Sequence, residues 1–226
     1  TPDVDAGVFS TVSDTMTRER INQNADHTIV FTLPATINWD STGSTDDLIV
    51  DFPEAATDFV QSGTWQTTDF TVNDGTSVTV SAVNTAAGTL TYPACGTDAV
   101  VAIDTTNLKF GFRRCSGASG AAATMTLTIL GASGGTGVLS NGSTVGSKTI
   151  SILQTDEGVA AAHSASLAVS LVDDDTASVT ATVTPSLSFD IDTSTSHIEV
   201  SGNPTPYSVA LGTITPGSVK SSNNTS

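Results

Sequence analysis

A strict alternation of apolar and polar residues in short runs constrains this chain more than any other feature. In HTIVFTLP, for example, Ile29, Phe31 and Leu33 fall on one parity. Successive side chains of a β-strand point to opposite faces, so the pattern predicts strands with one buried face. Gly, Pro, Asn and Asp bound the runs and mark turns. The predicted strands are residues 27–34, 46–53, 68–83, 89–92, 99–104, 107–113, 123–130, 148–153 and 163–172.

Roughly ten short strands separated by turn signals predict an all-β fold, an antiparallel β-sandwich of the Ig-like or jelly-roll kind. Helical spacing of apolar residues is almost absent. Asp74-Gly75 lies between two alternating runs and predicts a hairpin, because both residues tolerate the positive φ of a type I′ turn.

Two segments interrupt the strand pattern. Residues 131–147 are rich in Gly and Ser, which predicts a long loop or a loosely ordered hairpin with Asn141-Gly142 at its tip. Residues 14–26 have some helical character and predict a short helix or an irregular arm.

The acidic run Asp173–Asp175 divides the chain into a first β-sandwich domain, 1–172, and a second segment, 176–226, in which the alternation restarts. Two or three strands rarely bury enough apolar area to be stable alone. We therefore expect the start of a second, incomplete β-sandwich that is either truncated or completed by another chain. Its strand-pairing segment, 178–192, has these apolar residues on one parity: Val179, Ala181, Val183, Leu187, Phe189 and Ile191.

The charge balance excludes several classes of partner. Acidic residues number 23 and basic residues 7, giving a net charge of −16, which repels nucleic acid and anionic lipid. Only 13% of residues are charged, a composition typical of secreted β proteins with hydroxyl-rich surfaces. The sequence starts at Thr1 without signal-peptide features, which indicates a mature form or a fragment. No run approaches ~18 apolar residues, so we expect no transmembrane segment.

The two cysteines, Cys95 and Cys115, lie among predicted strands and could face each other across neighbouring strands. An even number of cysteines in an exported chain favours a disulfide. Closing a loop of about 20 residues would stabilise the fold by about 3 kcal/mol. The alternative is a pair of buried free thiols.

Two stretches carry a resemblance to a known family. SLAVSLVDDDTASVTATVTPSLSFDID, followed by LGTITPGSV, resembles the domain junctions of modular Ig-like β-sandwich surface proteins from ultrasmall candidate-phyla (Patescibacteria-type) bacteria. The opening FSTVSDTMTRERINQNADHTIVFTLP is similar to the segment that leads into a strand of that family. The resemblance implies a secreted, envelope-associated modular protein and carries over no catalytic residues.

Catalytic motifs are weak, and we expect no enzyme activity. Ser133 occupies the nucleophile position of a G-x-S-x-G match, but the residues that follow cannot form the helix that a nucleophile elbow needs. His27, His163 and His197 lack the spacing of metal ligands and are interpreted as solvated residues at strand ends.

The acidic linker is the one polar cluster with a physical case for binding a ligand. Asp173, Asp174 and Asp175 offer three carboxylates to Ca²⁺, which takes six to eight oxygen ligands. The alternative is a solvated hinge that like charges keep extended.

These features favour an extracellular structural protein, a subunit of a cell-surface layer or surface assembly whose partners are copies of itself. One alternative is a filament or pilus subunit that polymerises by strand addition, with 178–192 or the arm 1–13 as the added strand. Another is an adhesin or carbohydrate-binding module that presents aromatic residues to a glycan. The candidate aromatic residues are Trp39, Trp65, Tyr92 and Tyr207.

Overall fold

The computed structural model describes residues 8–34, 39–41, 47–53, 57–120, 122–156 and 159–174. The chain divides into two units, 1–177 and 178–226, and every described residue lies in the first. The described residues form thirteen strands and one 3-10 turn, η1 (Thr67–Asp69). The strands are β1 (Ser10–Met16), β2 (Asp26–Thr32), β3 (Asp47–Asp51), β4 (Phe59–Thr64), β5 (Phe70–Asn73), β6 (Ser77–Val78), β7 (Val80–Ala86), β8 (Ala99–Asp104), β9 (Lys109–Arg114), β10 (Thr124–Leu130), β11 (Thr136–Asn141), β12 (Gly146–Asp156) and β13 (Val159–Leu171).

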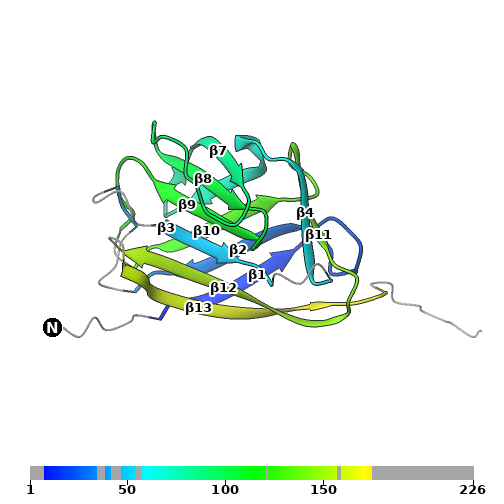
Figure 1. The fold of residues 1–226 in the computed structure, drawn as a ribbon. Coiled ribbons are helices and arrows are strands. Elements are labelled where there is room, and N and C mark those ends of the chain that lie inside the picture. Colours follow the sequence, from blue (N-terminus) through cyan, green and yellow to red (C-terminus); the bar gives the residue numbers. More distant parts are fainter. Residues whose placement is uncertain are drawn as a thin grey trace, which may run out of the picture. The chain divides into compact units, whose positions relative to one another are not determined.

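These strands form a sandwich of two main sheets (Figure 1). One sheet has five strands in the order β1-β2-β10-β5-β6, and the other has six in the order β13-β12-β3-β9-β8-β7. A separate two-stranded ribbon, β11-β4, is also present. The predicted all-β sandwich is therefore confirmed.

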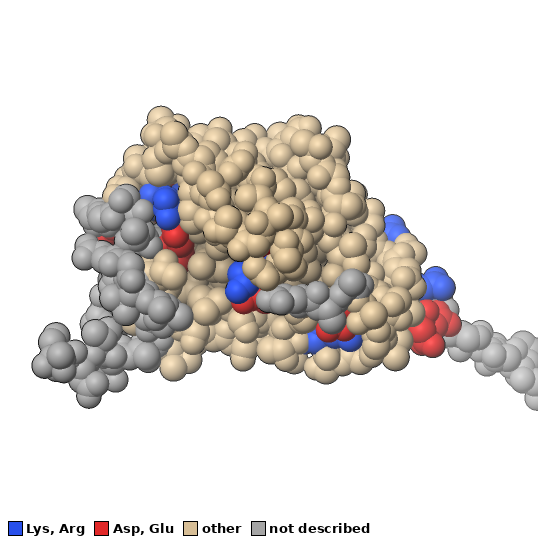
Figure 2. All heavy atoms as spheres, viewed as in Figure 1, with Lys and Arg blue, Asp and Glu red and all other residues tan. Residues whose placement is uncertain are grey.

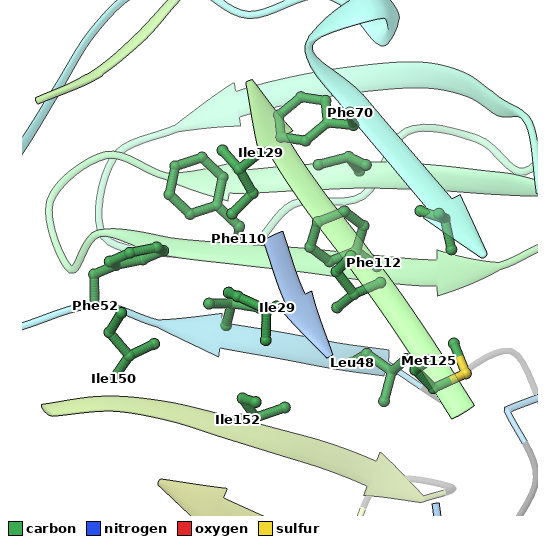
Figure 3. Packing of buried hydrophobic residues seen from close by; sticks show 14 of the residues in the cluster. Ile29, Leu48, Phe52, Phe70, Phe110, Phe112, Met125, Ile129, Ile150 and Ile152 are labelled. Carbon is green, nitrogen blue, oxygen red and sulfur yellow. The ribbon is translucent and has the colours of Figure 1, made fainter. Parts of the chain in front are cut away.

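The core lies between the two sheets and is made of the apolar parity of each strand (Figure 3). Ile29 of β2 and Leu127 of β10 are fully buried from one sheet, and Phe110 of β9 and Ile152 of β12 from the other. Phe110 also lies at the centre of an aromatic cluster, with ring centroids 5.2 Å from Trp65 and 5.7 Å from Phe52. Alternation in the sequence thus identifies the buried face of these strands correctly.

One strand pair departs from the antiparallel expectation. β7 and β8 are parallel, so residues 87–98 must cross from the end of one to the start of the other. The predicted strand 89–92 falls in this crossover and forms no strand. Leu90 and Tyr92 instead lie against the backbone of Gly111 on β9, at a position where a Cβ would come within 2.2 Å of the Tyr92 hydroxyl.

Both segments that interrupt the strand pattern contain strands. Of the two alternatives for residues 14–26, the short helix is wrong and the irregular arm holds for 17–25, whereas residues 14–16 belong to β1, which pairs with β2 up to Met16. In residues 131–147, β11 pairs with β4 along its whole length. Asn141 is not a loop tip but a buried residue whose side-chain amide donates to the carbonyl oxygens of Arg18 and Arg20.

The hairpin predicted at Asp74-Gly75 connects β5 to β6. Gly75 has a φ of +100°, whereas Asp74 does not have a positive φ, so the turn is not type I′. The Asp74 carboxylate accepts hydrogen bonds from the backbone and hydroxyl of Thr76, which fixes the turn from within.

Candidate functional site

The six-stranded sheet ends in β13, the longest of the described strands. On one side β13 pairs with β12 in a regular antiparallel ladder from Gly146 opposite Leu171 to Gln154 opposite His163. Natural edge strands are usually short, bulged, charged or interrupted by proline, which prevents pairing with other chains. β13 has the sequence VAAAHSASLAVSL, with no Asp, Glu, Lys, Arg or Pro. It therefore lacks the charged residues and prolines that commonly protect an edge.

The N-terminal segment touches the other side of β13 at two points. Val8 bridges Ser164 and Arg20 bridges Val172, both in parallel orientation. Between these bridges β13 advances by eight residues and the N-terminal segment by twelve. The longer path arises because β1 leaves β13 and pairs with β2 in the opposite sheet. Between the two bridges β1 still packs against β13, but in the described part of the chain it forms no backbone pairing with this edge.

The backbone groups along this open edge can be assigned by parity. Val172 donates its N–H to Glu19 O at 2.9 Å and accepts from Ile21 N at 2.8 Å, so its backbone points away from β12. In a regular strand alternate residues point the same way, which puts Ser166, Ala168 and Ser170 in the same orientation. Within the described part of the chain none of these three has a backbone partner on that side.

Apolar side chains line the seam between the two sheets next to this edge. Ala165, Leu167 and Val169 of β13 and Val12 and Met16 of β1 are only partly buried, although all five pack against the core. We call these five residues the seam cluster. An open groove of about 590 Å³ lies beside them. Its lining residues are Val8, Phe9, Val12, Ser151, Leu153, Ser164, Ala165 and Ser166.

The structure places the two cysteines together, with Cys95 Sγ bonded to Cys115 Sγ at 2.03 Å. The bond does not join neighbouring strands. Cys95 lies in the crossover 87–98, and Cys115 directly follows β9. The bond therefore ties the crossover to the six-stranded sheet.

The aromatic residues proposed as a glycan platform are mostly inside the fold. Trp39 is 0% exposed and Trp65 is 5% exposed. Tyr92 is partly buried under Arg113, whose guanidinium carbon lies 3.9 Å from the ring centroid. Tyr207 lies outside the described residues. Trp39 and Trp65 thus present no surface on which a sugar ring could stack.

The interpretation of His27 and His163 as solvated strand-end residues is wrong, since they are 0% and 3% exposed. His27 Nδ1 lies 2.7 Å from Asp14 Oδ2, and both side chains are fully buried. The ring also stacks edge-on against Phe52 at 5.0 Å. His197 lies outside the described residues.

Ser133 takes part in a turn and not in a nucleophile elbow. Its hydroxyl donates to Asp26 Oδ2 at 2.6 Å, and the backbone N–H groups of Ala132 and Ser133 donate to Asp26 Oδ1. The chain then continues into strand β11 instead of a helix. Asp26 therefore holds the turn after β10 against the start of β2.

The remaining predicted sites lie at or beyond the end of the described chain. Asp173 and Asp174 follow β13 and are exposed, and Asp175 lies outside the described residues. The described ranges contain no group of three or more His, Cys, Asp or Glu side chains arranged for a metal ion. The strand-pairing segment with Val179, Ala181, Val183, Leu187, Phe189 and Ile191 also lies outside them. The calcium site at Asp173–Asp175 stays a prediction.

In the part of the chain that the structure describes, no helix has the length and apolar character needed to cross a membrane.

No protein-family model and no curated protein matches the sequence. Among solved structures, the backbone protein of group B streptococcus pilus 2b is similar with 13% sequence identity and a TM-score of 0.38. The match covers 70% of this chain and 56% of that one.

Proposed function

We propose that this chain is an extracellular structural protein, a subunit of a cell-surface layer or another surface assembly. The observation that carries the proposal is the uncharged edge of β13, where Ser166, Ala168 and Ser170 have outward backbone groups without partners among the described residues. An open sheet edge is a template for pairing with another chain. The Cys95–Cys115 disulfide supports an extracellular location, because disulfides persist in oxidising compartments.

The same edge favours a second candidate, a filament subunit joined by strand addition. A single acceptor edge and a single added strand per subunit make a head-to-tail interface, which extends into a filament unless the rotation closes a ring. The buried Trp39 and Trp65 give no comparable support to a glycan-binding module.

The test of self-assembly uses the whole chain with its disulfide intact. Sedimentation velocity over a wide concentration range should show concentration-dependent oligomers, and electron microscopy of the largest species should show sheets or filaments. A monomer at every concentration and ionic strength would contradict the proposed function.

A further inference from the structure

We propose that the open edge of β13 accepts residues 179–183 of a second copy of this chain as an added strand. The inference rests on the proposed function, since it names the partner of the assembly surface. The acceptor is the stretch Ser166–Ser170 together with the seam cluster. The donor lies in the predicted strand-pairing segment, whose residues 179–183 have the sequence VTATV.

The backbone of the acceptor matches a short strand. Residues 166, 168 and 170 alternate along β13 and direct their N–H and C=O groups outward, so the open edge is five residues long. Five residues of strand extend over about 17 Å. The donor has the same length, and Pro185 follows it outside the paired stretch. Since an added strand pairs on one side only, a proline beyond this stretch is tolerated.

The side chains of the donor also match the seam. Directly opposite residues in a sheet share one face, so a strand beside β13 would direct alternate side chains towards the seam cluster. Val179, Ala181 and Val183 occupy these alternate positions and are small and apolar. Covering the partly buried seam cluster, which includes Leu167 and Val169, would remove apolar area from water.

Charge supports the pairing of two copies. The chain has a net charge of −16, which opposes contact between copies at most surfaces. β13 has no Asp, Glu, Lys or Arg. Residues 176–189, which contain the donor strand, have none either. These two segments can therefore approach each other without bringing like charges together directly.

Val172 closes one end of the acceptor stretch. The outward N–H and C=O of Val172 are already bonded to Glu19 and Ile21. An added strand can therefore pair with β13 only between the two bridges, and the proposed assembly takes that strand from a second copy.

The first test blocks the acceptor with Ala168→Pro. The N–H of Ala168 points away from β12, so the substitution removes an outward donor and leaves the β12–β13 ladder unchanged. We expect self-association to weaken by about tenfold or more, a change of about 1.4 kcal/mol per factor of ten. Ala168→Thr keeps the N–H and should associate like the wild type. Equal association of all three proteins overturns the proposal, provided that circular dichroism shows the same fold.

The second test changes the face of the donor. The double variant Val179→Lys, Val183→Lys places two charges on the face directed towards the seam cluster and should lose association. The double variant Thr180→Lys, Thr182→Lys adds the same charge on the opposite parity and should retain association. Equal effects of the two double variants contradict strand addition.

The third test asks which chain supplies the strand. One preparation carries Ala168→Cys and the other Thr180→Cys or Thr182→Cys, which lie on the same sheet face in the proposed pairing. Mixing under mild oxidation should give a dimer linked between copies, whereas Ala181→Cys, on the opposite face, should not react. A bond that forms only when both cysteines are in one chain, or no bond at all, overturns the proposal. If the wild type assembles, and Ala168→Pro and the double variant at Val179 and Val183 assemble equally well, this interface is wrong but the proposed function stands.

Discussion

Single buried carboxylates hold several loops of this fold in place. Asp26 accepts three hydrogen bonds from the turn at Ala132 and Ser133. Asp69 accepts from the backbone N–H groups of Gln66, Gly135 and Gly137. A carboxylate that accepts several N–H bonds is stabilised in its charged form. Part of the large acidic excess therefore has a structural role, and at Asp26, whose pKa is lowered, it makes the fold sensitive to acid.

Asp26 gives a prediction on the dependence of stability on pH. Burial acts to raise the pKa of Asp26, but the hydrogen bonds from Ser133 and Ala132 outweigh it and lower the pKa below 3.8. The unfolded state therefore binds this proton more readily than the folded state. The stabilisation is present above the unfolded pKa and is lost as pH falls through the folded pKa. We expect the melting temperature of the wild type to fall below about pH 4.

The variant Asp26→Asn isolates this contribution. At neutral pH it should lower the free energy of unfolding by about 1–3 kcal/mol, because the amide replaces a charged acceptor. Its melting temperature should also fall less steeply in acid than that of the wild type. Asp173→Asn removes an exposed carboxylate and is the matched control. Parallel curves for Asp26→Asn and the wild type would contradict the assigned role.

The pairing of His27 with Asp14 shows why the environment of some residues cannot be predicted from the sequence alone. Their side chains are 2.7 Å apart, but they meet only because β1 and β2 are neighbours in the sheet. The sequence before β2 gives too weak an alternation to predict β1. Without β1, His27 has no partner and looks like a solvated strand end. Ile29 and Phe31 were predictable as core because their alternation is local.

At the scale of elements, the crossover 87–98 was the hardest segment to predict. Its Thr-Leu-Thr-Tyr alternation is the pattern of a strand, but Leu90 and Tyr92 share one side because both pack on Gly111. A parallel pair such as β7–β8 depends on contacts distant in sequence, which local periodicity does not contain. The position of β13 at a sheet edge also depends on contacts that are distant in sequence. The absence of charge in β13 is visible in the sequence, but its position at a sheet edge is not.

The crossover gives a prediction on the disulfide. The bond closes a loop with a sequence separation of 20 residues, so replacing Cys95 and Cys115 by Ser should lower the free energy of unfolding by about 3 kcal/mol. Urea denaturation measures this change, and reduced wild type should behave like the double variant. Hydrogen exchange should increase first in the crossover, where Asn84 also donates to Thr91 O. An unchanged urea midpoint would show that the other crossover contacts suffice.

At the scale of the whole molecule, charge is sparse but strongly biased. On the face seen in Figure 2, uncharged residues cover most of the described surface, and several basic side chains lie next to acidic ones. The ion pairs of the structure include Lys109 with Asp51 and Lys148 with Asp58. Because the chain has only 7 basic residues and 23 acidic ones, most carboxylates have no basic partner to neutralise them. Two copies therefore repel each other at long range even where their strands fit.

This repulsion predicts that assembly depends on salt. Self-association should strengthen as NaCl rises and should level off when the Debye length falls to about 8–10 Å, near 0.1–0.15 M. Sedimentation at a fixed protein concentration measures the change. CaCl₂ at matched ionic strength separates screening from calcium binding, because screening alone gives similar curves for both salts. A larger effect of CaCl₂ that Asp173→Asn with Asp174→Asn abolishes would support the calcium site predicted at Asp173–Asp175. Assembly that is independent of salt would contradict the charge argument, since a net charge of −16 on each copy cannot then limit association.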